Sequence, residues 1–189
     1  MLFNGTNAYL NRTPATSTNS SVYTLSMWVK MGALKDEYIF AAGESTSNQT
    51  YIRIYGAKNQ AILWETDTSA TDNWSVQTNA LLRDPSAWYN LVFVYDSSLS
   101  GVSNQAKIYI NGIQASGSTT GSGTNSYVNT TVAHYFARQA SSSLYFDGYL
   151  SEVNLVDGQA LEPSAFGKTG AFGEWLPKKY TGTYGTNGF

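Results

Sequence analysis

The sequence contains no cysteine and a single histidine, His134. The absence of cysteine excludes disulfide bonds, thiol catalysis and metal sites built on thiolates. A single histidine excludes a metal site with several imidazole ligands, and it leaves His134 as the one candidate base for a Ser-His-Asp triad. No Gly-x-Ser-x-Gly motif accompanies it. His134 lies in a strand-like run, so the preferred interpretation is a packed or face-exposed histidine.

Charged residues are also scarce. They make up 13% of the 189 residues, against about 25% in an average globular chain. The 11 Lys and Arg against 13 Asp and Glu give a net charge of −2 and form no basic cluster, so we expect no nucleic-acid partner. No apolar run approaches the ~18 residues of a membrane-spanning helix, and residues 1–5 lack the basic and apolar stretches of a signal peptide. We therefore expect no membrane insertion.

Aromatic and hydroxyl-bearing residues are abundant. Phe, Trp and Tyr account for 14% of the chain, and Ser, Thr and Asn for roughly 30%, well above average usage. Residues 22–29 alternate with a period of two, and Tyr23, Leu25, Met27 and Val29 share the more apolar face, which is predicted to point into the core. Similar strand-like runs occupy residues 38–42, 51–55, 61–65, 74–77, 89–95, 106–110, 132–137 and 149–156.

Turn signals separate these strands. Asn111-Gly112 predicts a type I′ hairpin, because both central residues of this turn need a positive φ. Residues 116–126 contain only Ser, Thr, Gly and Asn, which predicts an exposed loop, and residues 162–167 predict one helical turn. Many short strands with at most one short helical turn predict an all-β fold, a two-sheet antiparallel jelly-roll sandwich.

Three groups of residues resemble a laminin G-like domain of the concanavalin A-like superfamily. Residues 3–10 and 23–30 (FNGTNAYL and YTLSMWVK) resemble its start. Residues 88–96 and 107–112 (WYNLVFVYD and KIYING) are similar to its central strands and hairpin, and residues 146–153 (FDGYLSEV) resemble its closing strand. The resemblance rests on the order and spacing of these groups, and it implies the same two-sheet jelly roll that the periodicity predicts.

The last residues carry a second resemblance. Residues 156–167 (VDGQALEPSAFG) and 175–189 (WLPKKYTGTYGTNGF) look like a segment that recurs in virion proteins of tailed bacteriophages. This resemblance implies a capsid decoration or a tail-fibre module, located in the virion after synthesis in the host cytoplasm. It implies other virion proteins as partners, such as the major capsid protein or fibre subunits. A homo-oligomer would match the symmetry of the particle, with a trimer as the working hypothesis.

The predicted domain organisation is a laminin G-like β-sandwich over residues 1–170 and an extended C-terminal segment over residues 171–189. The segment has large apolar side chains and two lysines but no regular period. Such a segment suits an interface with a neighbouring subunit, and packing on its own sandwich is the equal alternative. The predicted interface residues are Trp175, Lys178, Lys179 and Tyr180.

A catalytic carboxylate pattern is incomplete. Glycoside hydrolases of the superfamily place Glu-x-Asp-x-(x)-Glu on one strand, where alternate residues project to the same face. Glu65 and Asp67 supply the first half of this pattern, but Ser69 and Ala70 stand where the third carboxylate belongs. A retaining mechanism needs two carboxyl groups about 5–5.5 Å apart. We therefore expect no enzymatic activity and interpret the pair as a charged strand end that faces water.

Sugar binding is also compatible with the sequence, because aromatic faces and a few polar groups suffice for it. Two tryptophans flank a polar loop, and three tyrosines, Tyr51, Tyr55 and Tyr127, lie near turn segments. A place in the core or in an interface is the alternative for each of these rings. The predicted sugar-binding residues are Trp64, Trp74, Asp67 and Asn73. Trp28 and Trp88 lie in the strongest strand patterns and are assigned to the core.

Calcium is the one cofactor that the family resemblance implies, through Asp, Asn and carbonyl oxygens on loops. Asp96, Asn111 and Asp147 lie at strand ends that resemble such positions. Turn capping by the same side chains is the alternative.

Three functions follow from these patterns. The leading hypothesis is a non-enzymatic phage virion structural protein with weak glycan binding. The alternative is a free or surface lectin whose partner is a cell-surface glycan, and the last is a glycoside hydrolase.

Overall fold

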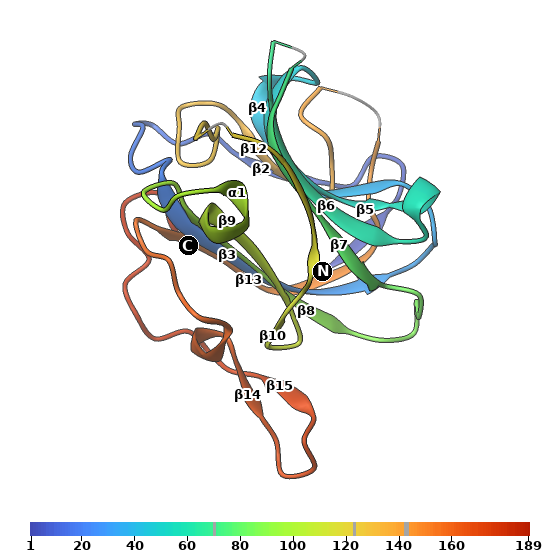
Figure 1. The fold of residues 1–189 in the computed structure, drawn as a ribbon. Helices are drawn as coiled ribbons and strands as arrows, with labels where there is room; N and C mark the ends of the chain where they lie inside the picture. Colours follow the sequence, from blue (N-terminus) through green and yellow to red (C-terminus); the bar gives the residue numbers. More distant parts are fainter. Residues whose placement is uncertain (70, 123, 142–143) are drawn as a thin grey trace.

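The computed structural model describes residues 1–69, 71–122, 124–141 and 144–189, and for residues 71–73 it describes the backbone only. The strands of this part of the chain form two facing antiparallel sheets (Figure 1). The order in the six-stranded sheet is β1 (Leu2–Asn4), β13 (Asp147–Asp157), β3 (Val22–Met31), β8 (Tyr89–Asp96), β9 (Ala106–Ile110) and β10 (Ile113–Gln114). The order in the seven-stranded sheet is β11 (Gly117–Gly121), β7 (Thr71–Leu81), β6 (Ala61–Thr68), β5 (Asn48–Tyr55), β4 (Glu37–Ser45), β12 (His134–Phe136) and β2 (Leu10–Arg12). The predicted two-sheet jelly roll is confirmed.

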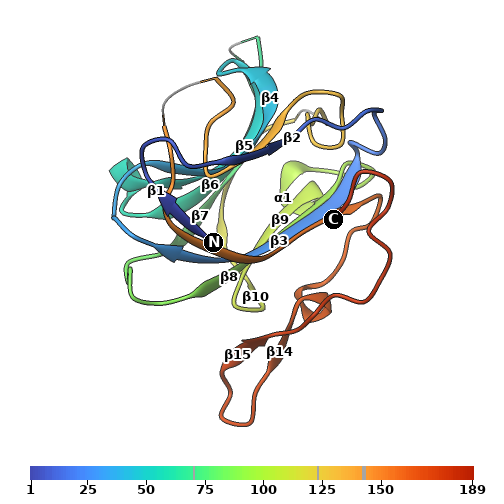
Figure 2. The ribbon, with the colours of Figure 1, turned by 180° about the vertical axis from the view of Figure 1, so that it is seen from behind.

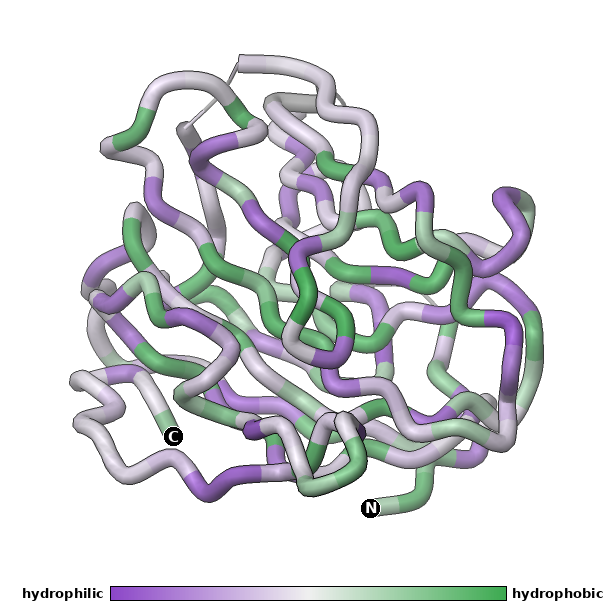
Figure 3. Tube along the Cα trace, turned by 60° about the horizontal axis from the view of Figure 1, so that its bottom comes forward, coloured by the Kyte–Doolittle hydropathy of each residue, from purple (hydrophilic) through white to green (hydrophobic). Residues whose placement is uncertain are grey.

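The core lies between the sheets and has aromatic rings at its centre. Trp64 on β6 meets Trp74 on β7 edge-on at 5.1 Å between ring centroids, and Phe93 on β8 at 5.5 Å. Trp74 also stacks on Tyr95 at 5.1 Å. Tyr23, Leu25, Met27 and Val29 of β3 are buried in the same core, as the alternation predicted. Figure 3 shows that hydrophobic stretches run through the strands, whereas many peripheral loops are pale or hydrophilic.

The turns follow the sequence signals in most places. Asn111 (φ 49°) and Gly112 (φ 80°) connect β9 to β10 with the predicted positive φ angles. The predicted helical turn is η2 (Pro163–Ala165), and the described residues include two further short turns, α1 (Val102–Gln105) and η1 (Gly56–Lys58). The exposed loop expected at 116–126 is partly wrong, because Gly117–Gly121 pair with β7 as edge strand β11. No helix in the described ranges is long and apolar enough to cross a membrane.

The C-terminal residues cover the outer face of the six-stranded sheet. Thr24 of β3 donates its hydroxyl to the Gln159 carbonyl and accepts from the Leu161 N–H, both at 2.8 Å. Apolar side chains of the segment and the sheet pack together in a second buried cluster, which contains Val92, Tyr109, Val156, Phe166 and Tyr180. Thr24 and Ser26, which point to the outer face of β3, are therefore buried as well.

A short two-stranded hairpin projects from the sandwich. It consists of β14 (Gly167–Thr169) and β15 (Trp175–Pro177). Figures 1 and 2 show from opposite sides that this hairpin extends away from the two sheets, beyond the β8–β10 edge. The tip carries Phe172, which is 96% exposed.

Candidate ligand-binding cleft

A cleft of about 440 Å³ opens where the end of β6 meets the loop before β12. We call it the hydroxyl cleft. Its lining residues are Thr68, Asn125, Ser126, Tyr127, Thr130 and Val132. This volume lies within the usual range of ligand pockets, roughly 300–1,000 Å³. Among the described lining residues, none carries a charge, and four have a hydroxyl group.

Buried polar side chains hold one wall of the hydroxyl cleft in place. The indole Nε1–H of Trp74 donates to the Asn125 carbonyl at 2.8 Å. The backbone N–H of Tyr127 donates to Thr50 Oγ1 at 2.8 Å, and Ser126 Oγ lies 3.1 Å from the hydroxyl of Tyr23. The wall is thus hydrogen-bonded to side chains of the core, which fixes the positions of its polar groups.

His134 holds the second wall. Its Nε2 accepts the backbone N–H of Asn129 at 2.9 Å, so Nδ1 carries the proton and donates to the Val132 carbonyl at 2.9 Å. Burial lowers the pKa of His134 to about 4, which keeps the ring neutral near pH 7. With both ring nitrogens engaged in backbone bonds, His134 positions the loop around Thr130, in agreement with the packed histidine that the sequence favoured.

Tyr127 supplies the aromatic surface of the hydroxyl cleft. Its hydroxyl donates to Asn48 Oδ1 at 3.4 Å, and the ring is half-buried. Burial, and then the carboxylate of Glu44, raises the pKa of Tyr127 above its ordinary value. The ring therefore presents a neutral hydroxyl group over the whole physiological pH range.

The predicted sugar-stacking role of Trp64 and Trp74 is wrong, because both indoles are 0% exposed in the core. A ring inside the sandwich cannot stack on a ligand, and Trp74 instead anchors the Asn125 backbone of the hydroxyl cleft. Asp67 alternates with Trp64 and Thr66 along β6, so it lies on the outer side of the seven-stranded sheet. The side chain of Asn73 falls outside the described part of the chain.

The assignment of Trp28 and Trp88 to the core is also wrong. Trp28 alternates with the core residues Met27 and Val29 on β3, so its indole lies on the outer face of the six-stranded sheet. Trp88 precedes β8 and is 41% exposed. Their strand patterns were interpreted correctly, but a pattern with period two does not reveal which ring faces the opposite sheet.

Glu65 and Asp67 share the outer face of the seven-stranded sheet. Glu65 lies opposite Tyr51 on β5 and Ser75 on β7, and its exposed fraction is only 8%, so the expectation of a strand end in water is wrong for this residue. Burial, followed by the Glu65 and Asp67 carboxylates, raises the pKa of Tyr51 well above its ordinary value. Ser69 has a left-handed φ of 54° after the strand, and Ala70 lies outside the described residues.

The three predicted calcium ligands do not come together. Asn111 adjoins Asn90, at one end of β8, and Asp96 is at the other end. Six residues separate the two ends, which is about 20 Å along a strand. Asp96 accepts the N–H and hydroxyl of Ser98, and Asn111 accepts the Asn90 N–H, as turn-capping side chains do. In the described ranges no group of three His, Cys, Asp or Glu side chains could hold a metal ion.

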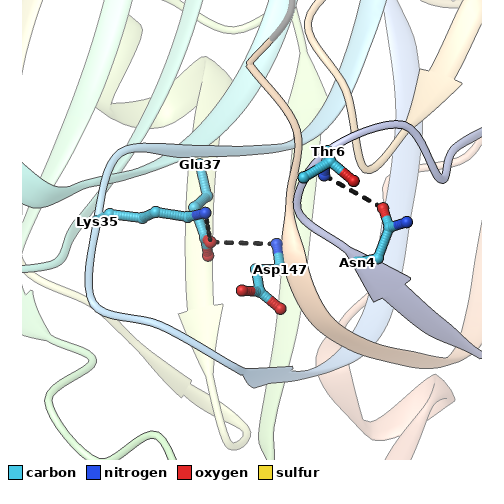
Figure 4. A network of polar contacts seen from close by, with 5 residues as sticks. All are labelled: Asn4, Thr6, Lys35, Glu37 and Asp147. Atoms are coloured by element: carbon cyan, nitrogen blue, oxygen red, sulfur yellow. Dashed lines mark hydrogen bonds and ion pairs between the residues drawn. The ribbon is translucent and has the colours of Figure 1, made fainter.

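Asp147 has different neighbours. Figure 4 shows its carboxylate near Glu37 and Lys35, with the Asp147 backbone N–H donating to Glu37 Oε1 at 3.1 Å. Lys35 Nζ lies 3.7 Å from the same oxygen. Burial raises the pKa of Glu37 to about 8, so this carboxyl is protonated over much of the neutral range. The arrangement is a buried acid with backbone and ammonium partners.

Two of the four predicted interface residues, Trp175 and Tyr180, pack on the sandwich. Trp175 Nε1–H donates to Asn90 Oδ1 at 2.9 Å, and Tyr180 is buried against Phe166 at 5.2 Å between ring centroids. Lys178 donates its ammonium to the Ser164 carbonyl at 2.8 Å, whereas Lys179 is exposed.

A family model for laminin G-like domains, described as the concanavalin A-like lectin/glucanases superfamily, matches residues 4–165. The chain belongs to this superfamily. The match covers the sandwich from the end of β1 onward, and the predicted laminin G-like resemblance is confirmed. A comparison with curated proteins found no match to the sequence.

Solved structures share the superfamily fold at low sequence identity. Domain 4 of an extracellular arabinanase from Geobacillus stearothermophilus, in complex with arabinotriose, is 20% identical with a TM-score of 0.61, covering 86% of this chain and 72% of that one. The sialidase CBM40 of Ruminococcus gnavus bound to α2,3-sialyllactose is 11% identical with a TM-score of 0.53, covering 80% and 91%. Domains LG4-5 of mouse laminin α1 are 12% identical with a TM-score of 0.58, and the match covers 96% of this chain and 46% of that chain.

Of the residues that line the hydroxyl cleft, the sequence indicated Tyr127 as an aromatic candidate and missed most of the others. Asn125 and Ser126 end the Ser/Gly-rich run that was interpreted as an exposed loop, and Thr130 and Val132 lie in the next connection. The polar loop between Trp64 and Trp74 did indicate the right region, because Thr68 from it lines the cleft. No local pattern signals the partnership, since the lining residues come from segments about 60 residues apart.

Proposed function

We propose that this protein is a non-catalytic glycan-binding module and that the hydroxyl cleft takes a neutral sugar. The observation that carries the proposal is the uncharged lining of the cleft, with hydroxyl groups, one amide and one half-buried tyrosine ring. Sugar hydroxyls both donate and accept hydrogen bonds, as the Ser, Thr and Tyr hydroxyls do. The aromatic ring offers an apolar face for the C–H side of a pyranose.

The composition of the lining also disfavours other ligands and chemistries. Proton transfer to a glycosidic oxygen requires a carboxyl pair, and phosphate recognition requires cations or N–H clusters. Neither kind of group is among the described lining residues. The superfamily assignment and the sugars named for two structural relatives are consistent with glycan binding.

A glycan array followed by calorimetry with the best neutral saccharide tests the proposal, each with and without calcium. We expect Tyr127→Leu to weaken binding at least tenfold, because the stacking face is lost, and Thr68→Val to weaken it several-fold. Thr169→Val on the β14 strand is the matched control and should bind like the parent protein. Absence of any bound saccharide, or equal binding by all three variants, would refute the assignment.

A second candidate function is a structural role in a phage virion, as a capsid decoration or fibre module. The observation that favours it is the C-terminal segment of residues 156–189, whose sequence resembles a virion segment and whose side chains cover the six-stranded sheet. Mass spectrometry of purified particles should then detect this chain at a stoichiometry set by the particle symmetry, such as a multiple of three. Particles that lack the chain would exclude this role without affecting the glycan proposal.

A further inference from the structure

The outer face of the six-stranded sheet carries a groove of about 350 Å³ beside the β14–β15 hairpin. We call it the tryptophan groove. Its lining residues are Trp28, Trp88, Ser151, Glu152, Trp175, Leu176 and Pro177. The three indoles come from β3, from the residue before β8 and from β15, so the groove exists only in the folded chain. Tyr149 extends the aromatic wall, with its ring 6.3 Å from that of Trp88.

The hairpin wall of the tryptophan groove is held in a defined position. Trp175 Nε1–H donates to Asn90 Oδ1 at 2.9 Å, and Asn90 is fully buried. The Trp175 ring also lies against Gly112 and Gly167, and a Cβ atom on Gly112 would come within 2.6 Å of it. Two glycines and one buried amide thus fix the plane of this indole, as expected for a preorganised site.

A β-bulge places a carboxylate beside the indoles. The register between β13 and β3 shifts between Ser151 and Asn154, and Glu152 lies in the bulge with a φ of +47°. Residues other than Gly, Asn and Asp rarely adopt this conformation, so glutamate here is strained. Bulges of this kind re-aim side chains, and Glu152 is exposed and lines the groove.

The charge that lines the tryptophan groove is negative. Glu152 is its single charged lining residue in the described part of the chain, and no ion pair to Glu152 is found among the described residues. Hydrogen bonds from Ser86 lower the pKa of Asp84, and Lys30, two residues along β3 from Trp28, adds to this effect. Lys178, next to Pro177, donates to the Ser164 carbonyl. A cationic ligand in the groove would meet this carboxylate.

We propose that the tryptophan groove binds a quaternary ammonium group, such as the trimethylammonium head of choline. The faces of tryptophan rings attract cations more strongly than those of tyrosine or phenylalanine, and desolvation strengthens the attraction. A carboxylate adds charge complementarity, while the methyl groups of the ligand contact the apolar walls. A primary ammonium or a metal ion is a poorer fit, because each needs several oxygen ligands, and the lining side chains supply only the Glu152 carboxylate and the Ser151 hydroxyl.

Titration with choline chloride, followed by tryptophan fluorescence and calorimetry, tests this site. We expect choline and tetramethylammonium to bind, and 3,3-dimethylbutan-1-ol, the uncharged isostere of choline, to bind at least tenfold more weakly. Equal binding of the isostere, or binding of methyl glycosides but not of choline at this groove, would overturn the proposal.

Variants distinguish the contribution of the Glu152 charge to choline binding from that of the aromatic side chains. Glu152→Gln and Trp88→Leu should each weaken choline binding at least tenfold, whereas the matched controls Glu44→Gln and Phe172→Leu should bind normally. Glu152→Gly is the most informative variant, because glycine suits the positive φ: it should melt at the same or a higher temperature and still lose choline binding. Unchanged binding by Glu152→Gly would contradict the role of the carboxylate.

Two further experiments identify the source of the quaternary ammonium group and test whether the tryptophan groove binds it independently of the hydroxyl cleft. Binding to phosphatidylcholine vesicles in addition to choline indicates a surface-borne head group, and binding to free choline alone indicates a soluble ligand. Equal binding to phosphatidylglycerol vesicles contradicts the proposal. Tyr127→Leu in the hydroxyl cleft should leave choline binding unchanged, so failure of either site is distinguishable.

Discussion

Trp64 and Glu65 are neighbours in the chain, yet one lies in the core and the other on the outer side of the seven-stranded sheet. The alternation of a strand separates the two side chains completely. At the scale of single residues, the same rule puts Trp28 outside while Met27 lies inside. Individual buried polar residues then determine how the structure responds to pH, and two of them act in opposite directions.

His134 should make the protein acid-sensitive. Its pKa is about 4 when folded, against about 6.5 for an unperturbed histidine. The stability from the neutral ring is therefore fully present above pH 6.5 and is lost as the pH falls toward 4, by about 3 kcal/mol. Urea unfolding of the parent protein and His134→Gln at pH 7 and pH 4 measures this. The variant should lose less stability between the two pH values, and an equal loss would contradict the assignment.

Glu37 should act in the alkaline direction. Its pKa is raised from 4.5 to about 8 chiefly by burial, so the folded state holds a proton that the unfolded state releases. The stability from the protonated acid is full below pH 4.5 and is lost as the pH rises through 8, on the order of a few kcal/mol. Glu37→Gln keeps the acceptor for the Asp147 N–H and cannot ionise. In urea unfolding at both pH values, we expect the variant to be more stable than the parent protein at pH 9 and similarly stable near pH 5. A difference in unfolding free energy that does not change with pH would disprove the raised pKa of Glu37.

At the scale of elements, the β14–β15 hairpin depends on one packed indole. A methyl group on Gly167 would collide with the Trp175 ring and push it away from Asn90. We expect Gly167→Ala to destabilise the protein by about 1–3 kcal/mol and to shift the NMR resonance of the Trp175 Nε1–H. Thr169→Ala on the same strand is the control and should lie within about 0.5 kcal/mol of the parent. An unperturbed indole resonance in Gly167→Ala would argue against this packing.

At the scale of the molecule, a buried polar hub ties distant parts of the chain together. Asn187 Nδ2 donates to the Thr16 carbonyl at 2.9 Å and to Thr18 Oγ1 at 2.8 Å, and its backbone N–H donates to Asp157 Oδ2 at 3.1 Å. Asn129 Nδ2 donates to the other oxygen of this carboxylate, Asp157 Oδ1, at 3.1 Å. Four segments of the chain thus meet at one point beside the six-stranded sheet.

Removal of this hub should lower global stability. Asn187→Ala leaves buried acceptors without a donor, which is expected to cost about 2–3 kcal/mol. Because the hub joins distant segments, hydrogen exchange should speed up in the strands of both sheets, and a double-mutant cycle with Thr18→Ala should show coupling. The exposed Asn104→Ala is the control and should change stability little. Faster hydrogen exchange confined to the last residues of the chain would indicate that Asn187 stabilises only its own segment.

The sequence allowed a large part of the fold to be predicted. The alternation in residues 22–29 and 89–95 places strands correctly, and Asn111-Gly112 positions a turn whose φ angles require those residues. These signals are local, since strand periodicity and turn chemistry act over a few residues. Local signals could not assign the sites. Asp96 and Asn111 look equivalent as strand ends, but they lie at opposite ends of β8.

Amino-acid composition and strand periodicity were therefore sufficient to predict an all-β sandwich with few charges and no thiol chemistry. These properties follow from residue type and from geometry over a few residues. Only the tertiary structure decided that Trp64 is buried and Trp88 exposed. It also brought together the residues of the two sites, Thr68 with Tyr127 and Glu152 with Trp175. The reason is that burial depends on what covers a strand face. For β3 the cover is a segment more than 130 residues further along the chain, and nothing in the strand itself encodes it.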